Sequence, residues 1–375
     1  MSRGKRLNFI NIQYSHTVPS SGYKQAPMRT GYEYVMPHKV SDKFCVSAEE
    51  DGVVTEISDK LIIVKYKSGK EVSYPAGIQY GNMEGSIYTH ELISDLKTGS
   101  KFKKNEALVY HKDFFERDWL DKTKLVMKST AVTTVALTMN NEVFEDSSAI
   151  SRKFAGVVTT ELVHTRTFLL EFNNNIIELL PVGTKVGPED ILFMALDETN
   201  DGGNLSSQSI AMLQNLAALS PRAKMDGVID RIEIKYNGDL NDMSPTVKKL
   251  AVKLDRDLFE RTKGTEYESK TNKVTAEYRS SGKSLNLDTF ELKVFIRVPL
   301  RMNIGDKLVF ANQMKSVVGE VFTYDIHTES GDEVNAMFSY QGVINRVVNS
   351  PIVMGTTNRI VRHISKRISE TYFKK

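Results

Sequence analysis

The chain has 375 residues, of which 40% are hydrophobic and 26% are charged, and its formal net charge is +3. This composition is typical of a soluble globular protein, and the length suits about two or three domains. No run of about 18 apolar residues occurs, so we expect no membrane span. The single cysteine, Cys45, excludes an internal disulfide and favours a reducing compartment. The basic start MSRGKRLNFINI lacks the apolar core and the small-residue cleavage site of a signal peptide.

Short runs rich in β-branched residues and bounded by turn residues recur along the chain. The clearest run, EEDGVVTEISDKLIIVKYKSGKEVSY, predicts strands at 53–57, 61–67 and 71–74, joined by a Ser-Asp-Lys turn and a Ser-Gly turn. A glycine before a β-branched pair returns at Gly156 and Gly227, where we expect a turn that leads into a strand. These patterns predict a mainly β fold built from several small barrel-like sheets.

Helical patterns are few. The stretch 206–219 carries apolar residues on one face after a Gly-rich lead. The stretch 244–263 is a stronger candidate, because Ser244 can cap it and Pro245 suits the first helical position. A third helix is expected in the basic tail from about Thr357. Polar segments rich in Gly, Ser and Thr precede the first helix and follow the second, so the two helices form a candidate inserted module.

The C-terminal tail RIVRHISKRISETYFKK holds six Lys and Arg residues against one Glu. A basic helix of this kind faces nucleic acid or an acidic subunit, or it is a solvated end of the chain. The sequence leaves these alternatives open.

The usual signatures of an enzyme that works alone do not occur in the sequence. The seven histidines are scattered without the spacing of metal ligands on a helix, and one cysteine excludes a zinc ribbon. Neither a Gly-x-Ser-x-Gly nucleophile elbow nor a Walker-type phosphate loop occurs. A self-contained hydrolase or kinase is therefore not indicated.

Three clusters remain as candidates for chemistry. Glu145 and Asp146 are adjacent carboxylates after an apolar run, although such pairs are also common in turns. Lys307 and Lys315 lie eight residues apart beside a short connection between strands, where they either reach a phosphate or are solvated. Arg346 stands between apolar residues, a setting in which arginine is usually paired or binds an anion.

Taken in order, these clusters resemble the C-terminal half of the β subunit of multisubunit RNA polymerases. GYKQAPMRTGYE (22–33) resembles the family's Arg-Gln-Ala-Val-Pro run and its Gly-Thr-Gly-Met-Glu element. VALTMNNEVFEDSSAISRKF resembles the family's Phe-Glu-Asp block, and NIGDKLVFANQMK keeps its Gly-Asp-Lys-x7-Lys spacing. YQGVINRVVNSPIVMGT resembles the Gly-Val-Pro-Ser-Arg-Met-Asn segment that follows. The resemblance covers about residues 20 to 365, with the blocks in the family's order.

The resemblance implies a mainly β fold with a few helices: a double-psi β-barrel, barrel-sandwich-type β elements and an inserted flap module. Residues 1–150 would hold the first part of the double-psi barrel and the hybrid-binding region. Residues 151–290 would form the flap-like insertion with two helices. Residues 291–375 would complete the barrel and end in the basic helix.

The resemblance also assigns roles to the three clusters. Lys307 and Lys315 would reach the RNA 3′ end and the α-phosphate region during nucleotidyl transfer. Arg346 would contact the incoming nucleoside triphosphate. Glu145 and Asp146 would lie near a second metal, through water rather than as direct ligands.

Partners follow from the same resemblance. The chain has no Asn-Ala-Asp-Phe-Asp-Gly-Asp-like run, so Mg²⁺ would be held mainly by a β′-like subunit. Lys24 and Gln25 would hold the RNA strand of the hybrid through backbone contacts. Further partners would be an N-terminal β fragment, template DNA, and a promoter-recognition factor that docks at the flap. No membrane is expected.

Several positions depart from the family pattern. FANQM replaces Gly-Arg-His-Gly-Asn between the two lysines, which should alter that connection. Heavy divergence and a length without room for the N-terminal β half resemble the split polymerases of giant bacteriophages. The chain would then act in the cytoplasm of a bacterial host or be packaged in a virion. The alternative is a β-rich protein without catalysis, either a nucleic-acid-binding module or a virion structural protein.

Overall fold

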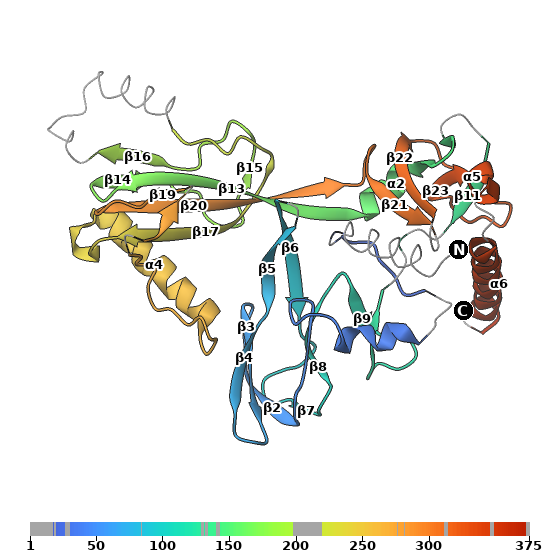
Figure 1. Cartoon of the computed structure of the whole chain (residues 1–375), viewed down its shortest axis with the longest axis horizontal. Helices are drawn as coiled ribbons and strands as arrows, with labels where there is room; N and C mark the ends of the chain where they lie inside the picture. The colour runs from blue at the N-terminus through green and yellow to red at the C-terminus, as the bar shows by residue number, and fades with distance from the viewer. Residues whose placement is uncertain are drawn as a thin grey trace.

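The computed structural model describes residues 18, 20–26, 31–83, 85–128, 131, 134–139, 143–197, 220–275, 277–280, 282–310, 314–345 and 349–372. This part of the chain is mainly β with a few helices, as predicted. It forms three lobes, which lie at the bottom, left and right of Figure 1. None of the described helices is long and apolar enough to cross a lipid bilayer.

An eight-stranded sheet links the three lobes. Its order is β1-β8-β6-β13-β20-β17-β15, with β5 paired to β6. Its strands are β1 (Cys45–Ser47), β5 (Gly77–Met83), β6 (Ser86–Ile93), β8 (Ala107–His111), β13 (Thr159–Glu171), β15 (Lys185–Val186), β17 (Gly227–Asn237) and β20 (Thr289–Arg301). The two 13-residue strands β13 and β20 pair along their whole length and run from the left lobe into the right lobe (Figure 1).

The lower lobe is built from the first third of the chain. Its four-stranded sheet has the order β4-β3-β2-β7. Its further elements are β2 (Gly52–Ile57), β3 (Leu61–Tyr66), β4 (Glu71–Pro75), β7 (Lys101–Phe102), the pair β9 (Phe115–Arg117) and β10 (Leu125–Met127), and the 3-10 helices η1 (Tyr32–Tyr34) and η2 (Met36–His38). The three strands predicted at 53–57, 61–67 and 71–74 are confirmed as β2, β3 and β4, because their buried aliphatic residues close a shared core.

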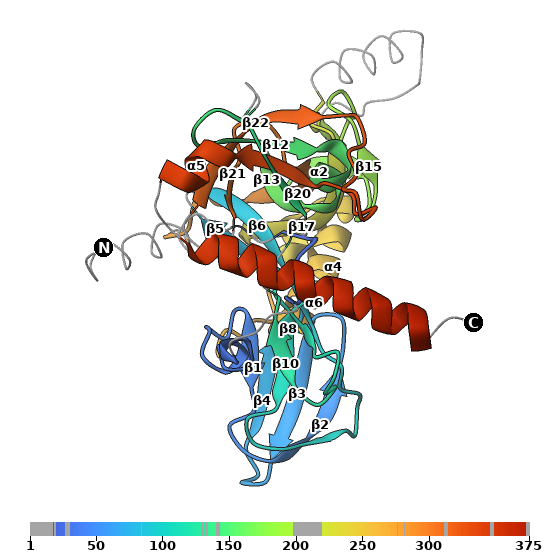
Figure 2. The same cartoon turned by 90° about the vertical axis from the view of Figure 1, so that its right-hand side faces the viewer.

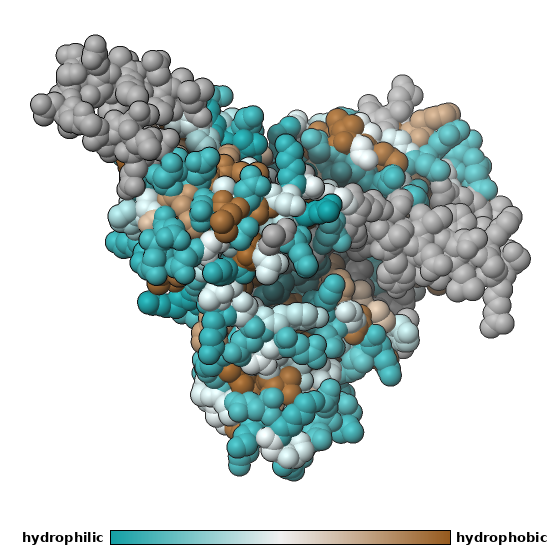
Figure 3. Space-filling view, turned by 60° about the vertical axis from the view of Figure 1, so that its left-hand side comes forward, coloured by the Kyte–Doolittle hydropathy of each residue, from teal (hydrophilic) through white to brown (hydrophobic). Residues whose placement is uncertain are grey.

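The left lobe packs one long helix against the sheet. Its further elements are β14 (Asn174–Ile177), β16 (Met194–Asp197), η5 (Leu240–Asp242), α4 (Pro245–Thr262), β18 (Arg279–Ser280) and β19 (Lys283–Ser284). Val247, Ala251 and Leu254 of α4 join buried side chains of β17 and β20 in one core. Seen from this side, the exposed apolar residues form small groups on a largely hydrophilic surface (Figure 3).

Two details of the predicted helices and turns need correction. The helix at 244–263 is confirmed as α4, with Pro245 first, but the Ser244 hydroxyl donates to the Asn174 carbonyl instead of capping the helix. Gly227 opens β17 as expected, whereas Gly156 lies inside the short helix α2 (Arg152–Val157). The predicted helix at 206–219 lies outside the described residues.

The right lobe interleaves two distant segments in one sheet. The order is β11-β23-β12-β22-β21, in which β11 runs parallel to β23 and β12 runs parallel to β22. Its elements are β11 (Val135–Thr138), β12 (Ser147–Ser151), α2 (Arg152–Val157), β21 (Lys307–Phe310), β22 (Met314–Phe322), β23 (Ala336–Ser339), α5 (Tyr340–Asn345) and α6 (Ser350–Tyr372). The basic tail is thus a helix that begins at Ser350, earlier than predicted. The described strands form an open path, so closure into a double-psi barrel stays a prediction, as do the domain boundaries at residues 150 and 290.

Candidate functional site

Lys307 and Lys315 lie on the antiparallel hairpin β21–β22, called the lysine hairpin below. Lys307 pairs with Val317, and Lys315 pairs with Val309. Side chains alternate between the two faces of the hairpin. Those that point into the lobe are Leu308, Phe310, Met314, Ser316 and Val318. Both lysines therefore share the outer face as diagonal neighbours, residues that lie about 7–8 Å apart in such a register. Two long side chains at that separation can converge on one anion.

A tight turn fixes the start of the hairpin. Gly305 has φ 94, which favours glycine, and its amide donates to the Val318 carbonyl at 2.8 Å. The Asp306 carboxylate accepts from the Asn303 amide at 2.8 Å. The turn predicted at Gly305-Asp306 thus places Lys307 at the first position of β21.

Glu145 and Asp146 form a turn just before β12, called the acidic turn below. Ser316 Oγ donates to the Asp146 carbonyl at 2.7 Å, and the Val317 amide donates to the same oxygen at 3.1 Å. Ser147 pairs with Val317 in the parallel β12–β22 ladder. The acidic turn is therefore fixed to the residues that directly follow Lys315.

The helix α5, which lies about 200 residues later in the chain, packs against the acidic turn. A Cβ added at Gly342 would lie 2.8 Å from the Glu145 carbonyl oxygen, so only glycine permits this approach. Glu145 itself has φ 51, an uncommon conformation for a side chain other than glycine. Arg346 follows α5 directly in the chain but lies outside the described residues.

The surroundings of Lys307 and Lys315 leave their ammonium groups able to bind an external anion. The Lys307 side chain is exposed and that of Lys315 is half-buried. Neither lysine forms an ion pair with any residue that the structure describes. A lysine ammonium group without a carboxylate partner can bind an external anion.

Lys24 and Gln25 lie in a different part of the molecule. Gln25 is 2% exposed, and its amide donates to the Arg117 carbonyl at 2.9 Å. The neighbouring Ser21 amide donates to the Thr159 carbonyl at 2.7 Å, which ties this segment to the start of β13. The Lys24 side chain is exposed. Gln25 thus serves the internal structure, and contact of either residue with RNA stays a prediction.

Across the described ranges, no three His, Cys, Asp or Glu side chains gather into a group that could hold a metal ion. Glu145 and Asp146 offer two adjacent carboxylates, the oxygen ligands that Mg²⁺ prefers. Two carboxylates suit contact with a metal through water, with the other ligands supplied from elsewhere.

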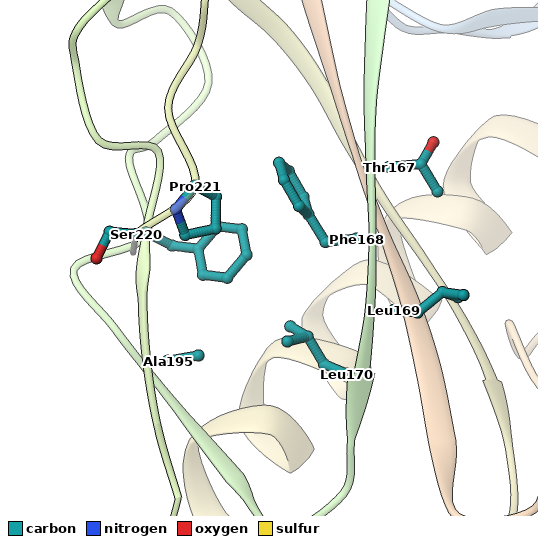
Figure 4. Close-up of a pocket in the computed structure, with 8 residues that line it drawn as sticks. Thr167, Phe168, Leu169, Leu170, Ala195, Ser220 and Pro221 are labelled. Carbon is teal, nitrogen blue, oxygen red and sulfur yellow. The ribbon is translucent and has the colours of Figure 1, made fainter. Parts of the chain in front are cut away.

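A pocket of about 390 Å³ lies in the left lobe, away from the lysine hairpin. Figure 4 shows Phe168 and Leu170 pointing into it toward Pro221, while Thr167 and Leu169 point away. Its lining residues are Thr167, Phe168, Leu169, Leu170, Phe193, Ala195, Ser220 and Pro221. The lining holds no acid or base, so this pocket offers no groups for proton or phosphoryl transfer.

Sequence reasoning did not single out Ser316 or Gly342, which hold the acidic turn. Ser316 is 1% exposed and occupies an inward position of β22, where an apolar residue is expected. A polar residue at an inward strand position was the available signal. Gly342 gave no signal, because the contact that requires it comes from a segment far away in sequence.

Comparison with known proteins shows which class of protein this chain is similar to. No family model matches the chain. The chain is similar to a β subunit of DNA-directed RNA polymerase, which supports the resemblance drawn from the motifs.

The particular relative is the DNA-directed RNA polymerase subunit beta of Mesoplasma florum. The two proteins are 22% identical over 316 residues, which is 81% of this chain and 23% of the relative. The chain therefore spans about a quarter of the length of the curated relative that it matches.

Proposed function

We propose that this chain is a subunit of a multisubunit DNA-dependent RNA polymerase and corresponds to a C-terminal part of the β subunit. The observation that carries the proposal is the junction of the lysine hairpin with the acidic turn. Ser316 and Asp146, which join them, are 170 residues apart in the chain. The similarity to a polymerase β subunit over 81% of the chain supports the same conclusion.

The proposed role follows from the chemistry of nucleotidyl transfer. The RNA 3′ hydroxyl attacks the α-phosphate of a nucleoside triphosphate, and pyrophosphate leaves. Because negative charge spreads over the phosphate oxygens, fixed positive charge nearby stabilises the transition state. In this proposal Lys307 and Lys315 reach the RNA 3′ end and the α-phosphate, and Arg346 contacts the incoming triphosphate.

Mg²⁺ is part of the proposal as a cofactor held mainly by a β′-like partner. When bound, the metal polarises the phosphate oxygens as a Lewis acid. Glu145 and Asp146 would contact that metal through water. The hydrogen bonds from Ser316 and Val317 to the Asp146 carbonyl hold the backbone of the acidic turn next to the strand that carries Lys315.

Within the assembled enzyme, each lobe of the chain has a proposed partner. The right-lobe sheet closes into a double-psi barrel against a β′-like barrel, and an N-terminal β fragment completes the subunit. The left lobe is the flap, where a promoter-recognition factor docks, and Lys24 and Gln25 hold the RNA strand of a hybrid with template DNA. The split organisation follows that of giant bacteriophages, and the enzyme acts in the host cytoplasm or is packaged in the virion.

The test uses the complex assembled from this chain and the proteins that co-purify with it. We expect a double variant, Lys307→Ala with Lys315→Ala, to reduce RNA extension by about 100-fold or more. Assembly, measured by size-exclusion chromatography, should be unchanged because both side chains lie on the outer face of the hairpin. Lys103→Ala, an exposed lysine of the lower lobe, is the matched control and should extend RNA normally.

Two results would argue for the non-catalytic alternative instead. One is extension at the wild-type rate by the assembled double variant. The other is the absence of any co-purifying chain with a metal-binding aspartate loop. The isolated chain is expected to make no RNA, since the metal ligands belong to the partner.

A further inference from the structure

The outer face of the lysine hairpin carries two valines beside its two lysines. Lys307 pairs with Val317 across the hairpin. Val309 pairs with Lys315, so all four side chains lie on one face. Val309 and Val317 are 38% and 41% exposed, whereas the inward residues of the hairpin are buried. Cationic and aliphatic side chains therefore alternate on this surface, which is called the lysine–valine face below.

The acidic turn lies on the same side of the right-lobe sheet. Val143, which leads into that turn, packs with Ala149 of β12. The next residue of β12, Ile150, shares the inner core with Leu308 of β21 instead. Because consecutive residues of a strand point to opposite faces, the chain before the acidic turn lies against the outer side of the sheet. Figure 2 shows β12, β21 and β22 close together above α6. The exposed carboxylates of the acidic turn thus flank the lysine–valine face.

The chemistry of the lysine–valine face indicates what it binds. A ligand that covers it must present an anion to the ammonium groups and a C–H surface to the valines within about 7–8 Å, the separation of diagonal neighbours. A nucleotide does so, because its phosphate is bonded directly to a ribose. The base fits less well than the ribose, because bases stack on aromatic rings and the four outward side chains include none. An acidic protein surface also fits less well, because the carboxylates of the acidic turn repel it.

We propose that Val309 and Val317 contact the ribose at the 3′ end of the RNA. This inference rests on the proposed function and adds two RNA-contacting residues to it. Removing water from the exposed part of both valines stabilises bound RNA. The two side chains carry no charge that could stabilise the transition state. They therefore determine how tightly the RNA end binds more than how fast it is extended.

The test uses the assembled complex and measures extension of an RNA primer on template DNA over a range of primer concentrations. In Val309→Thr with Val317→Thr, a hydroxyl replaces one methyl group at each site, and the β-branched shape is kept. We expect the primer concentration that gives the half-maximal rate to rise about fivefold, with less than about a twofold change in the rate at saturation. Val309→Ile with Val317→Ile keeps the aliphatic surface and should stay within about twofold of the wild type.

Val135→Thr is the matched control. Val135 is 37% exposed and lies on β11, the opposite edge strand of the same sheet. An equal rise in this control would overturn the inference. So would loss of a co-purifying chain from the threonine double variant in size-exclusion chromatography, because the face would then bind protein. If the wild-type complex extends RNA and the threonine double variant matches it, this inference alone fails. If the wild-type complex does not extend RNA, the proposed function fails as well.

Discussion

At the scale of single residues, Gly342 determines how closely α5 approaches the acidic turn. A Cβ there would lie 2.8 Å from the backbone oxygen of Glu145. We expect Gly342→Ala to lower the free energy of unfolding by about 1–3 kcal/mol, because the backbone itself must move. Urea unfolding measures this loss. Gly355→Ala in α6 is the control, since nothing lies within 4 Å of an added Cβ there. An equal loss in both variants would contradict the contact.

His111 gives a pH dependence at the same scale. Burial lowers the pKa of His111 from 6.5 to about 3. The unfolded chain therefore binds a proton at pH values where the folded chain does not. Stability from the neutral ring is complete above about pH 6.5 and is lost as the pH falls toward 3, with about 2 kcal/mol lost between pH 7 and pH 5.

His111→Phe tests this expectation. Phenylalanine keeps the ring contacts with Phe44 and Phe114, and it removes the His111 Nδ1 acceptor of the Asp113 amide at every pH. Urea unfolding at pH 7 and pH 5 should show a smaller loss in the variant than in the wild type. His90, whose pKa burial also lowers, accounts for a remaining slope. Identical losses in the two proteins would exclude His111 as the source.

At the scale of elements, a buried carboxylate fastens α4 to the sheet. Asp255 accepts from the Tyr236 hydroxyl at 2.8 Å and from both the amide and the side chain of Asn272, at 2.7 and 2.8 Å. We expect Asp255→Ala to lower the free energy of unfolding by about 3 kcal/mol, because buried donors lose their acceptor. Hydrogen exchange of α4 should rise. Arg256→Ala, the exposed neighbour, should change neither quantity measurably.

Local sequence patterns predicted some strands and helices but not the order of the strands in the right-lobe sheet. The strands at 53–57, 61–67 and 71–74 were predictable because alternation and turn residues act locally. The order of the right-lobe sheet was not, because β12 pairs with β22 across a gap of about 170 residues. The lysine spacing could be found in the sequence, whereas Ser316 and Gly342 gain their roles from neighbours distant in the chain. Ser244 has a capping residue type, but a nearby carbonyl takes its hydroxyl.

At the scale of the whole molecule, the three lobes meet around β5, β13, β17 and β20 (Figure 1). Tyr80 of the lower-lobe hairpin donates to Asp230 of β17 at 2.5 Å. Arg231 stacks over the Tyr80 ring at 4.2 Å and donates to the Ile78 carbonyl at 3.0 Å. This junction fixes the lower lobe relative to the strands that lead to the lysine hairpin.

Arg297 is the central cation of this junction. It pairs with Glu161 of β13 at 3.1 Å and with Asp230 of β17 at 3.2 Å, and the Asp230 side chain is only 7% exposed. We expect Arg297→Ala to lower the free energy of unfolding by about 2–3 kcal/mol, because it leaves a buried carboxylate without its cation. The radius of gyration from small-angle scattering should increase as the lobes separate.

Lys60→Ala is the control for this prediction. Lys60 joins the lower lobe to the left lobe, through Asp257 of α4 at 2.5 Å, but both side chains are about one-third exposed. Solvent screens such a pair, so its loss should lower the free energy of unfolding by no more than about 1 kcal/mol and leave the radius of gyration unchanged. A larger effect of Lys60→Ala than of Arg297→Ala would show that the peripheral contact, rather than the buried junction, sets the arrangement of the lobes.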